Sequence, residues 1–529
     1  MDFNFFKKSD SIKNGNGFGF YFTFSAIKFW IKLKPMTHEK LTRQQRRSAE
    51  RTLKKIKIIP SEVRLTSSSG LGFFLEIFDQ SPFSVHFKNC LPERKSHRSV
   101  GSYLLGLMML AGHIKGVHNI SSMRRVMFDE YLRELFYDEV AALRTLQDFL
   151  YDFEAEHVES LNIFLNNMAK AILEHLRRQR PHQISENFII DMDSSHHEHY
   201  GDNIEGLWFN YKNEWCLASH VAFDQFGFCH GIELEPGNTK PGTGAAEFIE
   251  RVFTDHRQQR LRRLEGLDFF RGDSAYCNQT VIKKCFELGI NFTLTAHKAS
   301  TQWDRQIEKT GLDWQAFQYS DEDIEKAKKS KQVLPKVDIA RFYWEPSWSK
   351  ETLKIPIVVQ RKWVTSTSVK DRSKKYGQKN FFEELDTTKE DGSWEYYAVV
   401  TNIDLSKWSL EEVIYHHRKR GNAENFIREG KYNFSLKNFP CEKLVHNQAW
   451  VCFAQVAHNL IRWIALLDNP DRPSFGKRIR DDFMFIPGKI VQDARGIILR
   501  VPLYAKEVLN KIEGWQFPGF NSARIFSTA

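Results

Sequence analysis

The sequence predicts an α/β protein: a mixed sheet flanked by helices, split by a β-rich insertion and preceded by an α-helical N-terminal domain. Helical periodicity fills residues 99–178, and short apolar strand-like runs alternate with helical patterns over 188–295. Helical periodicity returns after residue 405. The 529 residues, of which 41% are hydrophobic, are enough to bury several cores.

These changes of pattern set the predicted domain boundaries. The units are a basic arm (1–57), an α-helical domain (58–180), the first part of an α/β domain (181–296), a β-rich insertion (297–405), the second part of the α/β domain (406–470) and a C-terminal region (471–529).

The helical domain shows four amphipathic patterns, which predict helices at 99–114, 121–136, 138–153 and 158–178. Residues 138–150 have the small-residue spacing of a helix-turn-helix, which ordinary helical bundles share. The sequence leaves both interpretations open.

The segment after Pro181 predicts the order β-β-β-α-β-α-β. The expected strands are 188–193, 215–223, 226–234, 267–271 and 290–295, and the expected helices are 244–263 and 278–288. Two of these strands end at aspartates, Asp193 and Asp273. Because α/β sheets build their sites at the carboxyl ends of strands, both aspartates are candidate site residues.

A long interruption over residues 296–404 contains lysine-rich stretches and β-like runs, and it predicts an inserted β domain. Helices are then expected at 410–432 and 446–467. Gly421 lies inside the first of these helices, where it costs up to ~1 kcal/mol relative to alanine. It indicates either a close approach to the backbone or a bend.

Composition excludes several classes of protein. The seven scattered cysteines contain no C-x-x-C pair, which favours free thiols over a zinc ribbon. Residues 17–27 imitate a signal-peptide core without a small-residue cleavage site, and no apolar run approaches ~18 residues. We therefore expect a soluble cytoplasmic protein with no membrane partner. The cluster at residues 195–199 is rich in histidine, and we expect a polar loop there rather than a zinc site.

Positive charge is concentrated at the N-terminus. Residues 1–57 carry 14 Lys and Arg against 4 Asp and Glu, whereas the remaining residues carry 62 of each sign. Such an arm suits a polyanion such as DNA phosphate, and the alternative is a solvated tail without a partner. The candidate DNA contacts in this arm are Arg46, Arg47, Arg51, Lys54 and Lys55.

A two-metal phosphoryl-transfer site needs several carboxylates that converge on hard divalent cations. Asp193 and Asp273 supply two. Asp191 lies on the same strand face as Asp193, which we prefer because it is nearer the strand end. The third acid is expected on the helix at 410–432, where His417, Arg420, Glu424 and Lys431 fall within about 60° of one another. Surface ion pairs are the alternative explanation for this stripe.

Three motifs resemble those of the DDE transposases of bacterial insertion sequences. They are Ile190-Asp-Met-Asp193-Ser-Ser, Arg271-Gly-Asp273-Ser-Ala-Tyr276 and His417-x2-Arg420-x3-Glu424-x6-Lys431. The resemblance is to the subgroup whose third motif reads Y-x2-R-x3-E-x6-K and whose RNase H-like domain is split by a β-strand insertion. It also includes Leu65-Thr-Ser-Ser-Ser-Gly-Leu71 and Gly237-Asn-Thr-Lys240-Pro-Gly242. His417 replaces the usual tyrosine, although Tyr415 lies nearby.

The resemblance implies a metal-dependent nuclease and strand transferase. Asp193, Asp273 and Glu424 would hold two Mg²⁺ ions, for which Mn²⁺ is a substitute. His417, Arg420 and Lys431 would contact DNA. Trp344 or Trp348 in the insertion would stack a flipped base.

The implied partners are double-stranded DNA, as terminal inverted repeats and as target, and a second copy of the chain in a homodimer. The implied location is the bacterial nucleoid. Two other functions remain open from the sequence: an RNase H-like nuclease without strand transfer, and a transposase-derived DNA-binding regulator.

Overall fold

The computed structural model describes residues 42–44, 59–94, 100–136, 140–260, 267–309, 311–349, 353–365, 392–493 and 496–517. The chain divides into two compact units, Met1–Glu62 and Val63–Ala529. The predicted DNA contacts Arg46, Arg47, Arg51, Lys54 and Lys55 lie outside the described residues.

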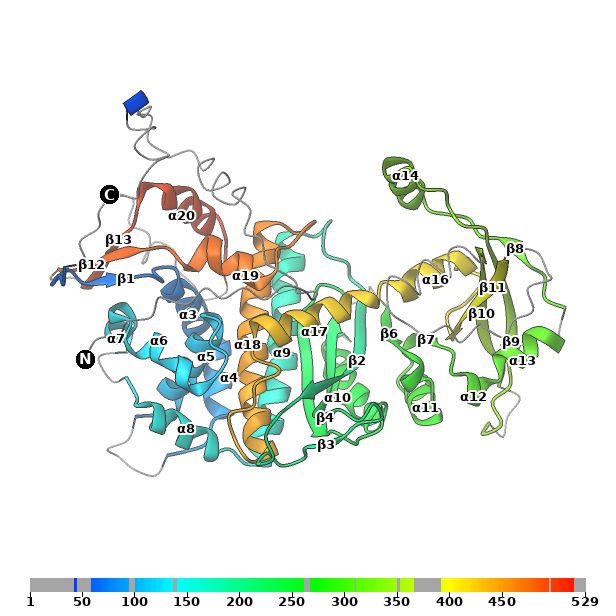
Figure 1. The fold of residues 1–529 in the computed structure, drawn as a ribbon, viewed down its shortest axis with the longest axis horizontal. Coiled ribbons are helices and arrows are strands. Elements are labelled where there is room, and N and C mark those ends of the chain that lie inside the picture. Colours follow the sequence, from blue (N-terminus) through cyan, green and yellow to red (C-terminus); the bar gives the residue numbers. More distant parts are fainter. Residues whose placement is uncertain are drawn as a thin grey trace, which may run out of the picture. The chain divides into compact units, whose positions relative to one another are not determined.

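A mixed sheet forms the centre of the second unit (Figure 1). Five of its strands have the spatial order β5-β4-β2-β6-β7, with β2, β4 and β5 antiparallel and β6 and β7 parallel to β2. The two-residue strand β3 (Trp208–Phe209) also pairs with β4. The five strands are β2 (Phe188–Glu198), β4 (Trp215–Asp224), β5 (Cys229–Pro236), β6 (Asp268–Gly272) and β7 (Asn291–Thr295). With helices α10 (Ala245–Arg260) and α11 (Gln279–Glu287), they confirm the predicted order of elements.

Strand β2 is longer than predicted, and the prediction of a polar loop at residues 195–199 is wrong. Residues up to Glu198 pair with β4, from Ser194 opposite His220 to Glu198 opposite Cys216. His197 is buried, with Nε2 2.8 Å from the Ser219 hydroxyl. Cross-strand pairing therefore holds these polar residues in an extended conformation despite their loop-like composition.

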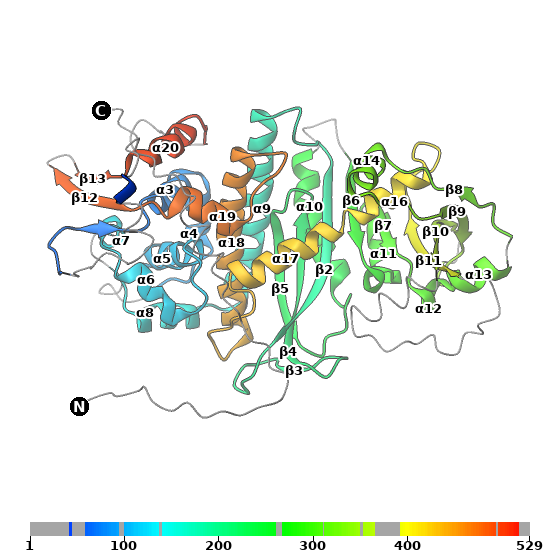
Figure 2. The same ribbon diagram turned by 45° about the horizontal axis from the view of Figure 1, so that its top comes forward.

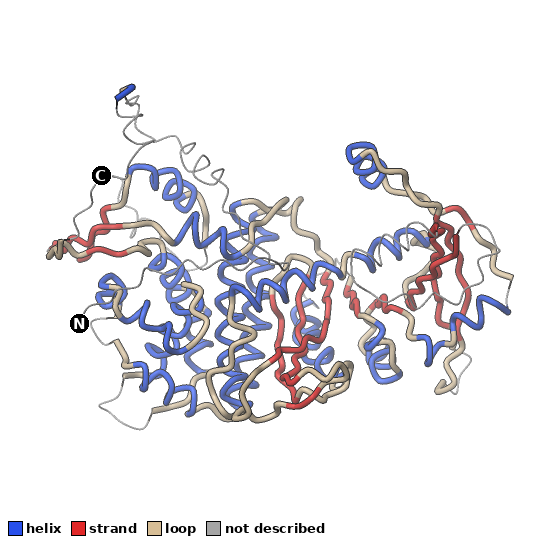
Figure 3. Tube along the Cα trace, viewed as in Figure 1, coloured by secondary structure: helices blue, strands red, loops and turns tan. Residues whose placement is uncertain are grey.

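The strands of the predicted insertion do not form a sheet of their own. Strand β11 (Gly392–Thr401) pairs antiparallel with β7, so the central sheet continues outward through β10 (Ile355–Thr365), β9 (Val337–Trp344) and β8 (Gln315–Ala316). Figure 3 shows both groups of strands and the helices around them. In the described part of this segment, the outer strands are accompanied by α12 (Lys298–Thr301), α13 (Trp303–Lys309) and α14 (Asp321–Ser330).

Two long helices, α9 (Ala155–Gln179) and α18 (Leu444–Asp468), pack against each other and against β5. Around them lie α3 (Leu71–Gln80), α4 (Phe83–Asn89), α5 (Ser102–Ile114) and α8 (Leu143–Tyr151). Among the described residues, α18 alone has the length and composition of a membrane span, although no such apolar run was expected. Its apolar window lies entirely inside the fold.

The helix predicted at 121–136 is broken into three short pieces: η1 (Ile120–Met123), α6 (Arg124–Met127) and α7 (Glu130–Leu135). Asp129 is the reason, because its carboxylate accepts hydrogen bonds from the backbone of Tyr131 and Leu132 and so begins a new helix. Lys115, 3.1 Å away, pairs with the same carboxylate.

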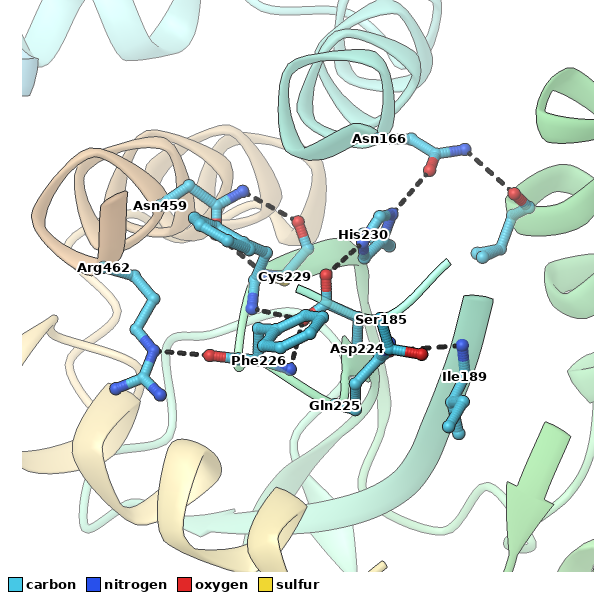
Figure 4. Close-up of polar contacts among 12 residues, drawn as sticks. Asn166, Ser185, Ile189, Asp224, Gln225, Phe226, Cys229, His230, Asn459 and Arg462 are labelled. Atoms are coloured by element: carbon cyan, nitrogen blue, oxygen red, sulfur yellow. Dashed lines mark hydrogen bonds and ion pairs between the residues drawn. The ribbon is translucent and has the colours of Figure 1, made fainter. Parts of the chain in front are cut away.

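The turn between β4 and β5 is fixed by buried polar contacts (Figure 4). Asp224 Oδ2 lies 3.1 Å from His230 Nε2, and His230 Nδ1 lies 2.9 Å from Asn166 Oδ1 on α9. Asn459 on α18 accepts from the Cys229 backbone at 2.8 Å. The hairpin is thereby tied to both long helices.

A small sheet that the sequence did not predict joins the two ends of the second unit. Its order is β1-β12-β13, from β1 (Leu65–Thr66), β12 (Gly488–Asp493) and β13 (Gly496–Arg500). The neighbouring C-terminal elements are α19 (Gly476–Ile479), the π-helical turn η3 (Arg480–Met484), η4 (Leu503–Ala505) and α20 (Lys506–Glu513).

Candidate active site

Asp193 and Asp273 line one cavity of about 1040 Å³. Asp193 lies on β2, and Asp273 directly follows β6, the strand that pairs in parallel with β2. Asp191 pairs with Arg271 across the two strands, so Asp193 and Asp273, two residues further along each chain segment, lie level with each other where β6 ends and β2 continues. This register brings the two aspartates together as the sequence predicted. Four lysines line the same cavity: Lys212, Lys240, Lys431 and Lys437.

Asp273 is oriented by the turn that follows it. Its Oδ1 accepts a hydrogen bond of 2.9 Å from the Ala275 backbone and caps the helical turn η2 (Ser274–Tyr276). Tyr276 is fully buried, with its hydroxyl 3.1 Å from His220 Nδ1. His220 Nε2 in turn faces Glu235 at 3.2 Å. A buried row of polar groups thus supports the turn that carries Asp273.

Asp193 carries an unfavourable buried charge. Burial raises the pKa of this carboxyl to about 6, the Arg420 guanidinium opposes the rise, and the negative charges of Asp273 and Glu424 add to it. The Ser194 backbone donates to Asp193 Oδ1 at 3.0 Å. The three predicted acids are therefore electrostatically coupled.

Glu424 does not line the cavity. It lies in the first turn of α17 (Gly421–Asn433) with 65% of its side chain exposed, and Arg420 connects it to Asp193. The guanidinium nitrogens are 3.5 Å from Asp193 Oδ2 and 3.6 Å from Glu424 Oε1. Arg420 thus bridges the two acids, and its single positive charge offsets only part of their combined negative charge.

The chemistry of the donor set fits a hard divalent cation, because all three acids offer carboxylate oxygens and their coupled charges favour a cation among them. As the side chains stand, the described part of the chain has no group of three His, Cys, Asp or Glu residues able to hold a metal ion.

Asp191 has a different environment from Asp193. It is buried and forms two hydrogen bonds with Arg271, one of 2.7 Å from Nη2 to Oδ2. Arg271 also donates to the His416 carbonyl at 2.8 Å. Asp191 is thus occupied in a structural ion pair, which favours Asp193 as the candidate ligand.

The helix predicted at 410–432 is interrupted at Lys419 and Arg420, between α16 (Leu410–Arg418) and α17 (Figure 2). A Cβ at Gly421 would meet no protein atom within 4 Å, so a break in the helix, and not a close approach within the protein, accompanies this glycine.

Contacts near its C-terminus fix the position of α17. The buried Glu429 accepts from the backbone of Gly476 at the start of α19. Arg480 donates to the carbonyl of Asn433 at 2.9 Å and to that of His113, at the end of α5, at 3.0 Å. The helix that carries Glu424 and Lys431 is therefore anchored to the helical core.

Lys431 lines the cavity, and its contact with DNA stays a prediction. Its ammonium donates to the His196 carbonyl at 2.9 Å. Burial lowers its pKa, and the carboxylates of Asp193, Glu198 and Glu214 oppose that shift.

His417 faces the interior. Its Nε2 lies 3.0 Å from the Thr295 hydroxyl and its Nδ1 lies 3.1 Å from the Thr293 carbonyl, both on β7. Burial, with the positive charges of Arg420 and Arg271, lowers its pKa to about 3, so the ring is neutral. Contact between His417 and DNA stays a prediction, and this burial counts against it.

The predicted stacking residues are also largely covered. Trp344 is 5% exposed, and its ring lies 6.3 Å from that of Trp348. Lys283 lies over the Trp348 ring at 5.2 Å. Stacking of a base on either tryptophan remains a prediction.

Sequence reasoning missed the lysines that line the cavity apart from Lys431. Lys240 lies within Gly237-Asn-Thr-Lys240-Pro-Gly242, so the motif itself was a usable signal. Gly242 has a positive φ of 85°, and a Cβ there would lie 2.5 Å from the Ala275 carbonyl oxygen. The glycine therefore lets this loop approach the turn that follows Asp273.

Fold and site together define an α/β protein with paired aspartates and lysines in a cavity at the carboxyl edge of its sheet. The model of the family "Transposase DDE domain group 1" matches residues 50–511. The chain belongs to this family of DDE transposases.

Comparison with solved structures gives a partial match to the Mos1 mariner paired-end complex with Mn, at 14% sequence identity. The match covers 31% of this chain and about half, 53%, of that chain. Its TM-score of 0.15 is too low to carry a conclusion about this chain. No curated protein matches the sequence.

Proposed function

We propose that this protein is a cut-and-paste DNA transposase that cleaves DNA at the ends of an insertion sequence and joins the freed 3′-hydroxyl to target DNA. One observation carries the proposal within the family: Asp193 and Asp273 share a lysine-lined cavity, and Arg420 joins Asp193 to Glu424. These three acids are the proposed catalytic residues.

The proposed fold of the catalytic part is RNase H-like. The strand order β5-β4-β2-β6-β7, three antiparallel strands followed by two parallel ones, supports it. The segment between β7 and α16 would be the insertion of the subgroup, here continuing the same sheet. The helices over residues 58–180 would form the DNA-binding domain.

Two Mg²⁺ ions, with Mn²⁺ as a substitute, are the proposed cofactors, held by Asp193, Asp273 and Glu424. When bound, divalent cations activate water or a hydroxyl and stabilise charge on the attacking and leaving oxygens. In the free protein Arg420 partly offsets the charges of Asp193 and Glu424, and its guanidinium is suited to bind a DNA phosphate.

The lysines around the cavity supply point charges for the phosphates on either side of the cleaved bond. The basic arm (residues 1–57) is proposed to supply most of the remaining electrostatic attraction between the protein and DNA. Removal of residues 1–57 should then flatten the dependence of DNA affinity on salt, measured as a log–log slope. An unchanged slope would remove the arm from the interface.

A homodimer is the proposed assembly, because two transposon ends must be held together.

The test begins with DNA that flanks the reading frame, searched for imperfect inverted repeats. A labelled duplex with such an end is incubated with the full chain and Mg²⁺, and a second duplex with a pre-cut 3′-hydroxyl end is incubated with supercoiled plasmid. Cleavage and joining are both expected. Cleavage without joining identifies a nuclease, and binding without either reaction identifies a regulator.

A further inference from the structure

The segment that connects β2 to β4 exposes an unusual set of aromatic side chains. Tyr200 is 96% exposed, Trp208 57%, Phe209 55% and Tyr211 75%. Large aromatic groups gathered on a surface indicate a binding site, because each leaves apolar area in water. Tyr200 and Tyr211 also line the cavity that contains Asp193 and Asp273.

The turn that carries Tyr211 is well fixed although its side chain is exposed. Asn210 is buried, and its side-chain oxygen accepts from the backbone of Lys212 at 2.8 Å and of Glu214 at 3.0 Å. Its amide donates to the Glu214 carboxylate at 2.6 Å. The Tyr211 ring lies 5.8 Å from the ring of His196 on β2.

The loop that carries Tyr200 is tied to the same hairpin. The Trp215 indole donates to the Gly201 carbonyl at 3.1 Å, and the His199 backbone donates to the Trp215 carbonyl at 2.9 Å. Both tyrosines are therefore presented by supported backbone, and a ligand that stacks on them meets a lower ordering cost.

Charges of both signs line the cavity beside these rings: the carboxylates of Glu198 and Glu214, and several ammonium groups. The Lys212 ammonium lies 5.4 Å from the centre of the Tyr211 ring, and Lys240 and Lys437 line the same cavity. Aromatic faces beside ammonium groups suit single-stranded nucleic acid, because unpaired bases stack on rings while their phosphates meet the cations. Bases in an intact duplex are already stacked on one another and cannot use such rings.

We propose that Tyr200 and Tyr211, named here the aromatic wall, form a stacking site for unpaired bases in DNA whose backbone reaches Asp193 and Asp273. The inference rests on the proposed function, since it assigns the cavity to DNA. It adds that the protein prefers DNA that is locally unpaired beside the reacting phosphate. The site lies between β2 and β4, outside the outer strands that carry Trp344.

Two DNA probes of the same sequence test the aromatic wall: a short duplex, and the same duplex with a bubble of about four unpaired bases, a length that a stacking groove can hold. Affinities of the full chain are measured by fluorescence anisotropy without divalent metal, so that no cleavage occurs. The variant Tyr200→Ala/Tyr211→Ala should bind the bubble about tenfold more weakly and the duplex almost unchanged. Tyr200→Phe/Tyr211→Phe should keep the preference, because stacking needs the ring and not the hydroxyl.

Tyr504→Ala, a substitution of another exposed tyrosine outside the cavity, is the matched control and should change neither affinity. Equal affinity of wild type for both probes, or an equal loss on both in the alanine variant, overturns the proposal. Circular dichroism verifies folding. Since no step requires cleavage, a wild-type protein that prefers the bubble but never cuts DNA would refute the transposase function and leave the stacking site standing.

Discussion

Two aspartates on β2, only two residues apart, belong to regions with opposite electrostatic designs. In the buried layer, Asp191 forms two hydrogen bonds with Arg271, and each side chain is 2% exposed. In the cavity, Asp193 shares one guanidinium with Glu424 and faces Asp273, and its pKa is raised to about 6. The buried layer pairs one carboxylate with one guanidinium, whereas at the cavity two carboxylates share one guanidinium.

On one face of β2, aspartate therefore has a structural role at Asp191 and a proposed functional role at Asp193. An ion pair as deep as Asp191–Arg271 persists only if each charge is fully partnered. Arg271 also donates to the backbone of His416, so the pair holds α16 against the sheet. At the cavity, the repulsion of Asp193 by Asp273 and Glu424 is unfavourable for the free protein and favourable for binding cations.

The largest effect is expected from removing the cavity acids. Asp193→Ala, Asp273→Ala and Glu424→Ala should each lower DNA cleavage by on the order of a thousandfold or more, because each removes a proposed metal ligand worth several kcal/mol. Binding to end DNA should stay within a few-fold of wild type. Asp202→Ala, an exposed acid that does not line the cavity, is the control. Full activity in one of the three would remove that residue from the site.

Breaking the buried pair should affect folding instead. Asp191→Asn leaves Arg271 without its counter-charge and should lower the free energy of unfolding by about 3–5 kcal/mol, measured by urea denaturation. The double variant Asp191→Leu/Arg271→Met should recover most of this loss, because it leaves no buried charge. If Asp191→Asn leaves the free energy of unfolding unchanged, the Asp191–Arg271 pair does not stabilise this part of the fold.

In contrast to Asp191→Asn, Asp193→Asn should raise the free energy of unfolding of the metal-free protein. The folded-state pKa of Asp193 is raised from 3.8 to about 6, so the native state binds the proton more tightly than the unfolded state. Stability present below pH 3.8 is therefore lost as the pH rises through 6, by up to about 3 kcal/mol. The gain of the variant over wild type should grow across that window and level off above it. A gain that does not depend on pH would contradict this account.

The smallest effect concerns the row of polar groups beneath Asp273. Tyr276→Phe removes the hydroxyl that faces His220 and should lower the free energy of unfolding by about 1 kcal/mol. Cleavage should fall a few-fold through misplacement of Asp273, with DNA affinity unchanged. The control is the loss of unfolding free energy caused by His220→Ala, measured in wild type and in Tyr276→Phe. If the two losses are equal, the two side chains act independently and the row has no joint role.

Local patterns in the sequence predicted a large part of the fold. The order of strands and helices along the chain around Asp193 and Asp273 follows from alternating hydrophobicity and turn residues, which act over a few residues. The stripe of Arg420, Glu424 and Lys431 follows from helical geometry and survives the break at Lys419 and Arg420. The extension of β2 to Glu198 escaped prediction because a partner strand, and not its own composition, makes it extended.

From the sequence one could read the family motifs, the order of the main helices and strands along the chain, and the candidate acids. Periodicity and spacing are local properties, so they need no knowledge of the folded chain. Folding decided that Asp191 pairs with Arg271 through two hydrogen bonds, whereas Asp193 shares Arg420 with Glu424. It also decided that His417 is enclosed by β7 and that β11 continues the sheet beyond β7. These outcomes depend on contacts between residues far apart in the chain. Burial and charge are set by such contacts, so the chemistry of each acid emerges only after folding.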